Sequence, residues 1–175
     1  SAGKKTAMLS TVLNRINGVD LPTKLTTQQP DYLNVFFDVC GKEGVEWVVM
    51  EVAAQAFSLH RVDGLMFDIG IFTNFSQEHG EFYTSMAEYF AAKAKILEHL
   101  KPGAPLLVNA DDERAMELGV RYDDTYVFSR TLYTCPALIG DFNSYNIAAA
   151  ATCAHHVGIK REDIQRALDT FVGVP

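Results

Sequence analysis

Short apolar runs alternate along this chain with segments of helical periodicity. The runs predict strands over residues 8–12, 46–52, 67–73, 106–108 and 126–128. The runs 46–52, 67–73 and 106–108 are almost continuously apolar, which predicts strands buried on both faces of the sheet. Amphipathic spacing predicts helices over residues 30–41, 85–100, 113–118, 143–157 and 161–171. Strands that alternate with helices of this length form βαβ units, in which the crossover helices cover the sheet. We therefore predict one three-layer α/β domain over residues 1–175, with a mostly parallel sheet and helices on both faces.

The composition excludes several classes of protein. A formal net charge of −7 argues against a nucleic-acid backbone as the main partner. No apolar run approaches the roughly 18–20 residues that a membrane span needs, so no membrane partner is expected. The three cysteines, Cys40, Cys135 and Cys153, lie far apart and form no CxxC pair. We expect them to be reduced thiols, which argues against a disulfide scaffold or zinc ribbon and favours a cytoplasmic protein.

Polar side chains follow three of the predicted strands. Glu51 follows the first apolar run of the three, the segment from Asn74 to His79 follows the second, and Asn109 with its acidic neighbours follows the third. Ligands of open parallel sheets bind at the carboxyl ends of the strands. A single cluster of this kind is more often only the polar loop that must end a strand, whereas three of them at the predicted ligand edge weaken that explanation. Glu51 and His79 have the chemistry of ligands for Mg²⁺ or its bound water, although a lone histidine more often has a structural role.

Lys93 lies on the apolar face of the predicted helix 85–100. Ser85 and Glu88 have the spacing of a capping box at the start of that helix. The apolar stripe that follows consists of Met86, Tyr89, Phe90, Leu97 and Leu100. At about 100° per residue, Lys93 falls in the middle of the stripe. A lysine there either extends to solvent, pairs with an anion, or loses its charge by desolvation. A neutral amine can act as a base or take up CO₂ to form a carbamate, whose head group resembles a carboxylate.

Five blocks of the sequence, in this order, resemble the central ATPase domain of the Mur ligases, and most of all the MurE type. The blocks are VVMEV (48–52), HRVDG (60–64), FTNFSQEHGEFYTSMAEYFAAKAKIL (72–97), LLVNADDE (106–113) and IGDFNSYNIAAA (139–150). The MurE type adds the third residue to UDP-N-acetylmuramoyl-L-alanyl-D-glutamate in peptidoglycan synthesis. ATP phosphorylates the substrate carboxylate, and the incoming amine then displaces phosphate from the acyl phosphate.

The resemblance implies a P-loop-NTPase-like fold, ATP as a substrate, Mg²⁺ as a cofactor, and UDP-muramoyl-peptide and amino-acid partners. The sequence does not determine the oligomeric state, and we expect a monomer. Matched position by position, it implies Mg²⁺ ligands at Glu51, His79 and a carbamylated Lys93, which would also be the catalytic set. It further implies UDP-muramoyl contacts at Thr26, Thr27 and Arg61, and adenine-side contacts at Asn143 and Asn146.

Several departures from the family pattern bear on activity. The chain has no G-x-x-G-K-[ST] phosphate loop, and Gly3 to Thr6 aligns better with the segment that follows the phosphate-loop helix. Relatives have Ser-Ser-His where this chain has Ala53, Ala54 and Gln55. The region 129–139 is shorter than in relatives, and the chain stops where the family's C-terminal domain begins.

We therefore expect a partial central domain that lacks the first strand–P-loop–helix unit and is inactive alone. The alternatives are another ATP-dependent ligase of the superfamily, such as a folylpolyglutamate or cyanophycin synthetase relative, and a catalytically dead Mur-like binding module. The replacements at residues 53–55 motivate the second alternative.

Overall fold

The computed structural model describes residues 3–76 and 82–173, which divide into two compact units. The N-terminal unit, described over residues 3–63, contains β1 (Thr6–Leu9), β2 (Asn14–Ile16), β3 (Val19–Leu21), α1 (Pro30–Lys42), β4 (Trp47–Met50) and α2 (Ala54–Ser58). The C-terminal unit, residues 64–173, contains β5 (Gly70–Phe72), α3 (Met86–Ala94), the 3-10 helix η1 (Lys95–His99), β6 (Leu106–Asn109), α4 (Glu113–Gly119), β7 (Thr125–Phe128), α5 (Asp141–His156) and α6 (Arg161–Asp169).

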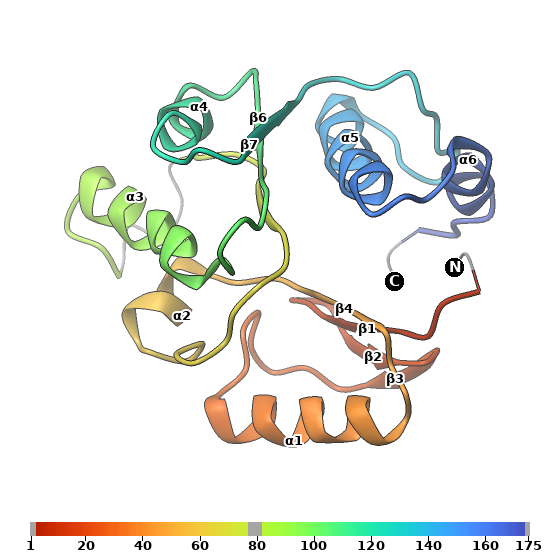
Figure 1. Ribbon diagram of the computed structural model, residues 1–175, viewed down its shortest axis with the longest axis horizontal. Coiled ribbons are helices and arrows are strands. Elements are labelled where there is room, and N and C mark those ends of the chain that lie inside the picture. The colour runs from red at the N-terminus through yellow and green to blue at the C-terminus, as the bar shows by residue number, and fades with distance from the viewer. Residues whose placement is uncertain (1–2, 77–81, 174–175) are drawn as a thin grey trace. The chain divides into compact units, whose positions relative to one another are not determined.

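The N-terminal unit is built on a mixed sheet with the strand order β3-β2-β1-β4. β1 and β4 run parallel, with Leu9 opposite Met50, while β2 and β3 are antiparallel to their neighbours. α1 lies along the sheet (Figure 1) and buries Leu33, Phe36 and Cys40, which share one helical face. The parallel β1–β4 pair therefore ends at a common edge, where the residues after each strand come together.

The β2–β3 hairpin is absent from the sequence prediction, although a signal for it exists. Asn17 and Gly18 connect the two strands, and both have positive φ, 48° and 87°. Asn-Gly is the preferred pair for the two-residue hairpin turns that need left-handed backbone at both positions. The strands escape recognition because each has only three residues, too few for an alternating pattern to stand out.

β4 lies at an edge of its sheet, which corrects the prediction of a strand buried on both faces. Trp47, Val48 and Val49 are 40%, 37% and 67% exposed. The strand pairs with β1 on one side, and no strand of the described chain pairs with the other. Continuous apolar character is typical of a buried parallel strand, but it does not determine whether a second strand pairs with the strand's other side.

The C-terminal unit contains the predicted three-layer arrangement. Its sheet has the order β5-β6-β7, and all three strands are parallel. Leu106 and Val108 on β6 pack with residues of α3 and α4, whereas Leu107 packs with Ala148 and Ala149 of α5. Figure 1 shows α4 and α5 on opposite sides of β6 and β7. The α/β fold class is thus confirmed, and the buried character of the 106–108 strand is confirmed with it. Where the prediction has one sheet, the structure has two, a parallel sheet in this unit and a mixed sheet in the N-terminal unit.

The predicted helix 85–100 is two elements, because α3 ends at Ala94 and the chain continues as η1. Ser85 caps α3 by accepting a hydrogen bond from the Glu88 amide at 3.1 Å. Glu88 in turn accepts from the amide and hydroxyl of Thr84, one residue before the position that a standard capping box uses. Met86, which was expected in the apolar stripe, is 38% exposed.

No helix in residues 3–76 and 82–173 is long and apolar enough to cross a membrane.

Candidate active site

Glu51 and Thr11 meet at the carboxyl edge of the N-terminal sheet. Each follows one strand of the parallel β1–β4 pair, and the ladder continues as the Glu51 amide donates to the Leu9 carbonyl at 2.9 Å. The Thr11 amide and hydroxyl both donate to Oε2 of Glu51, at 2.6 and 2.9 Å. Within the described residues, Oε2 is the oxygen of this carboxylate that accepts hydrogen bonds. Oε1 is therefore available to another group, since Glu51 is exposed.

The loop that holds the predicted substrate threonines folds against the same edge. Thr27 is 1% exposed, and its hydroxyl donates to the Glu51 carbonyl at 3.1 Å while it accepts from the Ala53 amide at 2.9 Å. Thr26 is half-buried, and its hydroxyl lies 3.1 Å from the Thr11 hydroxyl. Thr27 thus links the loop to the turn between β4 and α2, while Thr26 is the member of the pair that solvent can reach.

Arg61 supports this loop from the segment after α2. One of its terminal nitrogens donates to the Thr27 carbonyl at 3.1 Å, and the side chain is half-buried. Gln28, which is 7% exposed, donates to the Leu25 carbonyl at 2.7 Å and to the Thr23 hydroxyl at 2.8 Å. Three predicted substrate residues and Glu51 therefore converge within the N-terminal unit, on a loop whose buried polar groups are hydrogen-bonded.

Lys93 occupies the position that helical periodicity predicts for it. Its ammonium lies 5.2 Å from the ring centroid of Tyr89, one turn earlier on α3, and 5.6 Å from that of Phe72. Phe72 is the last residue of β5, so Lys93 stands at the carboxyl end of that strand. The side chain is half-buried. Aromatic faces attract a cationic amine at such distances.

The polar clusters after β5 and β6 are connected, as their position at one edge predicts. Asp112 accepts from the Phe75 amide at 2.8 Å with one oxygen and caps α4 through the Ala115 amide at 2.7 Å with the other. Asp111 accepts from the Ser129 hydroxyl, just beyond the end of β7. Both aspartates have local hydrogen-bond partners, so this part of the edge is explained by loop structure as well as by a ligand site.

Asn143 and Asn146 lie together in the first turns of α5. Asn143, 9% exposed, donates to the Ile139 carbonyl at 2.8 Å and accepts from the Asn146 amide at 3.3 Å. Asn146 is exposed. The structure brings the predicted pair together, with Asn143 engaged in holding the start of the helix and Asn146 on the surface.

Of the predicted Mg²⁺ ligands, Glu51 and Lys93 lie in the part of the chain that the structure describes. His79 lies outside the described residues, and within residues 3–76 and 82–173 no group of three or more His, Cys, Asp or Glu side chains could hold a metal ion. Glu51 fits as one ligand, because Mg²⁺ prefers carboxylate oxygen and Oε1 is unused. Lys93 fits only after carbamylation, since an ammonium group has no lone pair to share.

The segment from Gly3 to Thr6 does not form a phosphate-binding loop. Lys4 pairs with Glu46 at 2.7 Å, and Lys5 donates to the Glu43 carbonyl at 2.8 Å. Thr6 begins β1, whereas a phosphate loop leads into a helix whose N-terminus faces the phosphates. This agrees with the alignment of the segment downstream of the phosphate-loop helix.

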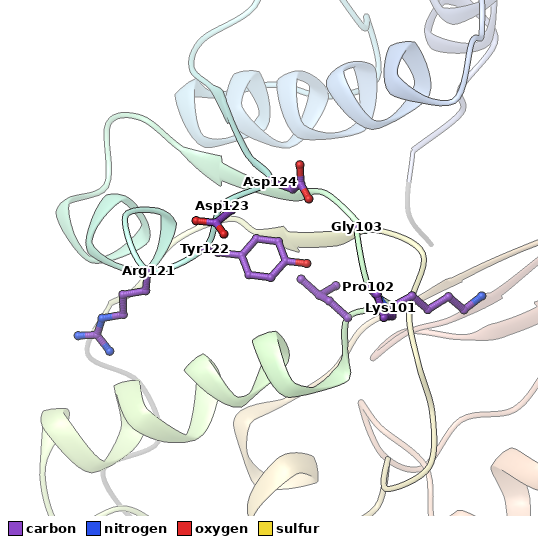
Figure 2. A pocket seen from close by; sticks show the side chains of 8 residues that line it. Lys101, Pro102, Gly103, Arg121, Tyr122, Asp123 and Asp124 are labelled. Atoms are coloured by element: carbon purple, nitrogen blue, oxygen red, sulfur yellow. The ribbon is translucent and has the colours of Figure 1, made fainter.

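A pocket of about 360 Å³ lies at the other end of the C-terminal sheet. Its lining comes from the segments that lead into β6 and β7, which are the amino ends of those strands. Figure 2 shows the Tyr122 ring directed toward the segment 100–103, while Lys101 and Arg121 extend in opposite directions. Lys101 pairs with Asp68 at 2.6 Å, and Arg121 pairs with Glu117. Ligands of α/β sheets bind at the opposite edge, so the pocket is separate from the predicted site.

Sequence reasoning missed Thr11, which it placed inside a strand over residues 8–12. The strand ends at Leu9, so Thr11 belongs to the loop that follows. No local pattern identifies Thr11 as a partner of Glu51, because the two are 40 residues apart in the sequence.

The chain is similar to a family profile and to several proteins that share one name. The family profile described as the Mur ligase middle domain matches residues 2–131. A relative from Caldanaerobacter subterraneus subsp. tengcongensis is 31% identical over 193 residues, which cover 94% of this chain and 39% of the relative. Another, from Corynebacterium glutamicum, is 46% identical over 93 residues, 53% of this chain and 18% of the relative. Both are named UDP-N-acetylmuramoyl-L-alanyl-D-glutamate--2,6-diaminopimelate ligase.

A solved structure of a protein with the same ligase name superimposes with a TM-score of 0.76 at 20% identity, over 98% of this chain and 42% of that one. At this identity the likeness concerns the fold. The chain spans about two fifths of the length of the relatives that it matches along most of its length. The first relative aligns over more residues than the 175 of this chain, so it carries residues in the matched region without a counterpart here. Shortening at 129–139 stays a prediction.

Proposed function

This chain belongs to the Mur ligase family through its middle domain, and from that premise we propose that it is part of an ATP-dependent, amide-forming ligase of the MurE type. The ligase would join an amino acid to UDP-N-acetylmuramoyl-L-alanyl-D-glutamate through an acyl phosphate. The relatives' name specifies 2,6-diaminopimelate as the amino acid. Their name also favours this reaction over that of a folylpolyglutamate or cyanophycin synthetase.

The observation that carries the proposal is the convergence of Glu51, Thr26, Thr27 and Arg61 at one sheet edge. Four residues matched separately to the family pattern lie within one hydrogen-bonded arrangement. The differing burial of the two threonines assigns them different roles in the proposal. Thr26 contacts the UDP-muramoyl substrate, and Thr27 holds the loop in position, with Arg61 fixing the loop's backbone.

In the C-terminal unit, Lys93 and His79 are the proposed metal-binding residues and Asn143 and Asn146 the proposed adenine-side pair. Lys93 would act as its carbamate, whose oxygens replace the ammonium group beside Tyr89 and Phe72. In the N-terminal unit, Glu51 would offer Oε1. Bound Mg²⁺ would neutralise the phosphate charge that otherwise repels the incoming carboxylate. The amino-acid amine then attacks the acyl phosphate carbon, and phosphate leaves.

We place the protein in the cytoplasm, where the nucleotide-linked substrates of such a ligase are made. The cysteines support a reducing compartment, because Cys40, Cys135 and Cys153 are all free thiols. We also propose that the protein is a monomer and that it does not bind nucleic acid.

The test is product formation by the natural polypeptide that contains these residues. It receives ATP, Mg²⁺, UDP-N-acetylmuramoyl-L-alanyl-D-glutamate and 2,6-diaminopimelate, and mass spectrometry detects the amide. We expect Lys93→Ala to remove most of the activity and a short carboxylate such as acetate to restore part of it. Lys101→Ala, which removes an exposed lysine of the same unit, should leave the activity unchanged.

Two results would contradict the proposal. Full activity of Lys93→Ala would refute the carbamate role. A second measurement checks this, because the wild type would then show no carbamate signal in its NMR spectrum after incubation with isotope-labelled bicarbonate. Absence of amide product from the natural polypeptide, together with intact binding of the UDP-muramoyl substrate, would favour the catalytically dead binding module.

A further inference from the structure

Thr11, which is not among the residues matched to the family pattern, forms two hydrogen bonds with Glu51. Its amide and its hydroxyl both reach the same carboxylate oxygen, Oε2, at 2.6 and 2.9 Å. Hydrogen bonds to a carboxylate are stronger than those between neutral groups. Two donors on one oxygen restrict the rotation of the carboxylate and leave Oε1 without a hydrogen bond among the described residues.

The Thr11 hydroxyl also lies 3.1 Å from the Thr26 hydroxyl, so the proton positions in this chain of groups can be assigned. An ionised carboxylate only accepts hydrogen bonds, and a hydroxyl has a single proton to donate. Thr11 must therefore give its proton to Glu51, and Thr26 gives its proton to the Thr11 oxygen. The hydrogen bonds run in one direction, from the Thr26 hydroxyl through the Thr11 hydroxyl to the carboxylate.

We propose that Thr11 is the positioning residue of Glu51 and that Thr26 acts on Glu51 through Thr11. Thr26 fixes the rotation of the Thr11 hydroxyl, and Thr11 presents Oε1 of the carboxylate to a divalent cation. This rests on the proposed function, in which Glu51 binds Mg²⁺. Groups that orient a metal ligand in this way typically change metal affinity by about 10- to 100-fold when they are removed.

The test measures Mn²⁺ binding to the 175-residue chain by electron paramagnetic resonance, with Mn²⁺ in place of Mg²⁺. Thr11→Val keeps the shape and the amide but removes the hydroxyl, and it should weaken Mn²⁺ binding by about tenfold. Thr11→Ser restores the hydroxyl and should bind as the wild type does. Ser10→Ala is the control, because the Ser10 hydroxyl donates within the same loop, to the Leu13 carbonyl at 2.7 Å, and is not bonded to Glu51.

A double-mutant cycle tests the order of the three groups. Thr26→Val should weaken Mn²⁺ binding in the wild-type background and should have no further effect in the Thr11→Val background, because Thr26 acts through Thr11. Circular dichroism verifies that each variant is folded, and Thr11→Ala replaces Thr11→Val if the valine variant is not.

The outcomes separate this inference from the proposed function. Wild-type affinity in Thr11→Val, or an equal loss in Ser10→Ala, overturns the positioning role while Glu51 remains a metal ligand. Additive effects of Thr11→Val and Thr26→Val overturn the directed chain. If the wild type binds no Mn²⁺, the inference fails together with the Glu51 metal role, whereas binding of the UDP-muramoyl substrate, measured separately by calorimetry, reports on the substrate part of the proposed function.

Discussion

Individual residues of the candidate site differ in how far their side chains are already committed to the fold. Thr27 and Asn143 are buried and hydrogen-bonded to nearby backbone, while Thr26 and Asn146 remain accessible. A buried polar group without a partner is costly, so such residues can be kept for the fold alone. Residue identity therefore does not distinguish a substrate contact from a loop anchor, and burial does.

The Glu88 carboxylate predicts that the stability of α3 depends on pH. Hydrogen bonds from the hydroxyl and then the amide of Thr84 lower the pKa of Glu88 below its ordinary value of 4.5. A carboxyl with a lowered folded-state pKa stabilises the fold above its unfolded pKa, and that contribution is lost as the pH falls through the folded pKa. The protection of the α3 amides against exchange, expressed relative to the intrinsic exchange rate at each pH, should therefore fall on acidification below about pH 4.5.

Glu88→Gln should reduce that pH dependence, since glutamine does not ionise. Glu98→Gln, at an exposed position in η1, is the control and should leave the acid response of α3 unchanged. An identical acid response in wild type and Glu88→Gln would show that the Thr84 bonds contribute nothing to α3 in solution.

Helices and strands of the C-terminal unit are held by a sheet that packs on both faces. Alternate residues of β6 point to opposite layers, with Leu106 and Val108 toward α3 and α4 and Leu107 toward α5. All three side chains are 0% exposed. The small residues Ala148 and Ala149 let α5 approach the sheet closely, which explains the alanine run of this helix.

Leu107→Ala should destabilise the C-terminal unit by about 2–5 kcal/mol, the usual range for removing a fully buried leucine side chain. The cavity would lie between β6 and α5, so amide exchange should increase in α5 more than in α3. Val127→Ala, at a position 55% exposed on the neighbouring strand, is the matched control. Equal losses of stability in the two variants would contradict the assigned packing.

The whole molecule matches Mur ligase middle domains along most of its length, and yet its 175 residues contain no G-x-x-G-K-[ST] sequence. The nearest approximation is used in another way, because Lys4 and Lys5 are bonded to Glu46 and the Glu43 carbonyl. Backbone amides that surround phosphate are the main requirement for holding ATP in this class of fold. The described residues therefore offer no such loop for the phosphates of ATP.

We expect the 175-residue chain to release no phosphate from ATP in the presence of Mg²⁺. A phosphate-release assay measures this, and circular dichroism of the same preparation verifies that the protein is folded. Hydrolysis that Lys4→Ala or Lys5→Ala abolishes would contradict the prediction and would assign the phosphate role to the segment from Gly3 to Thr6.

The sequence by itself determined the order and type of most elements, because periodicity is a property of neighbouring residues. It also determined the family and the unusual position of Lys93, which helical geometry alone places beside Tyr89. Local signals that span few residues, such as the Asn17–Gly18 turn, were present but weak.

Only the tertiary structure decided how many neighbours a strand has and which distant side chains meet. β4 is as apolar as a central strand but lies at an edge, and Thr11 meets Glu51 across 40 residues of sequence. The physical reason is that parallel strands bring their carboxyl ends together only after a crossover, so the pairing depends on register and not on local pattern.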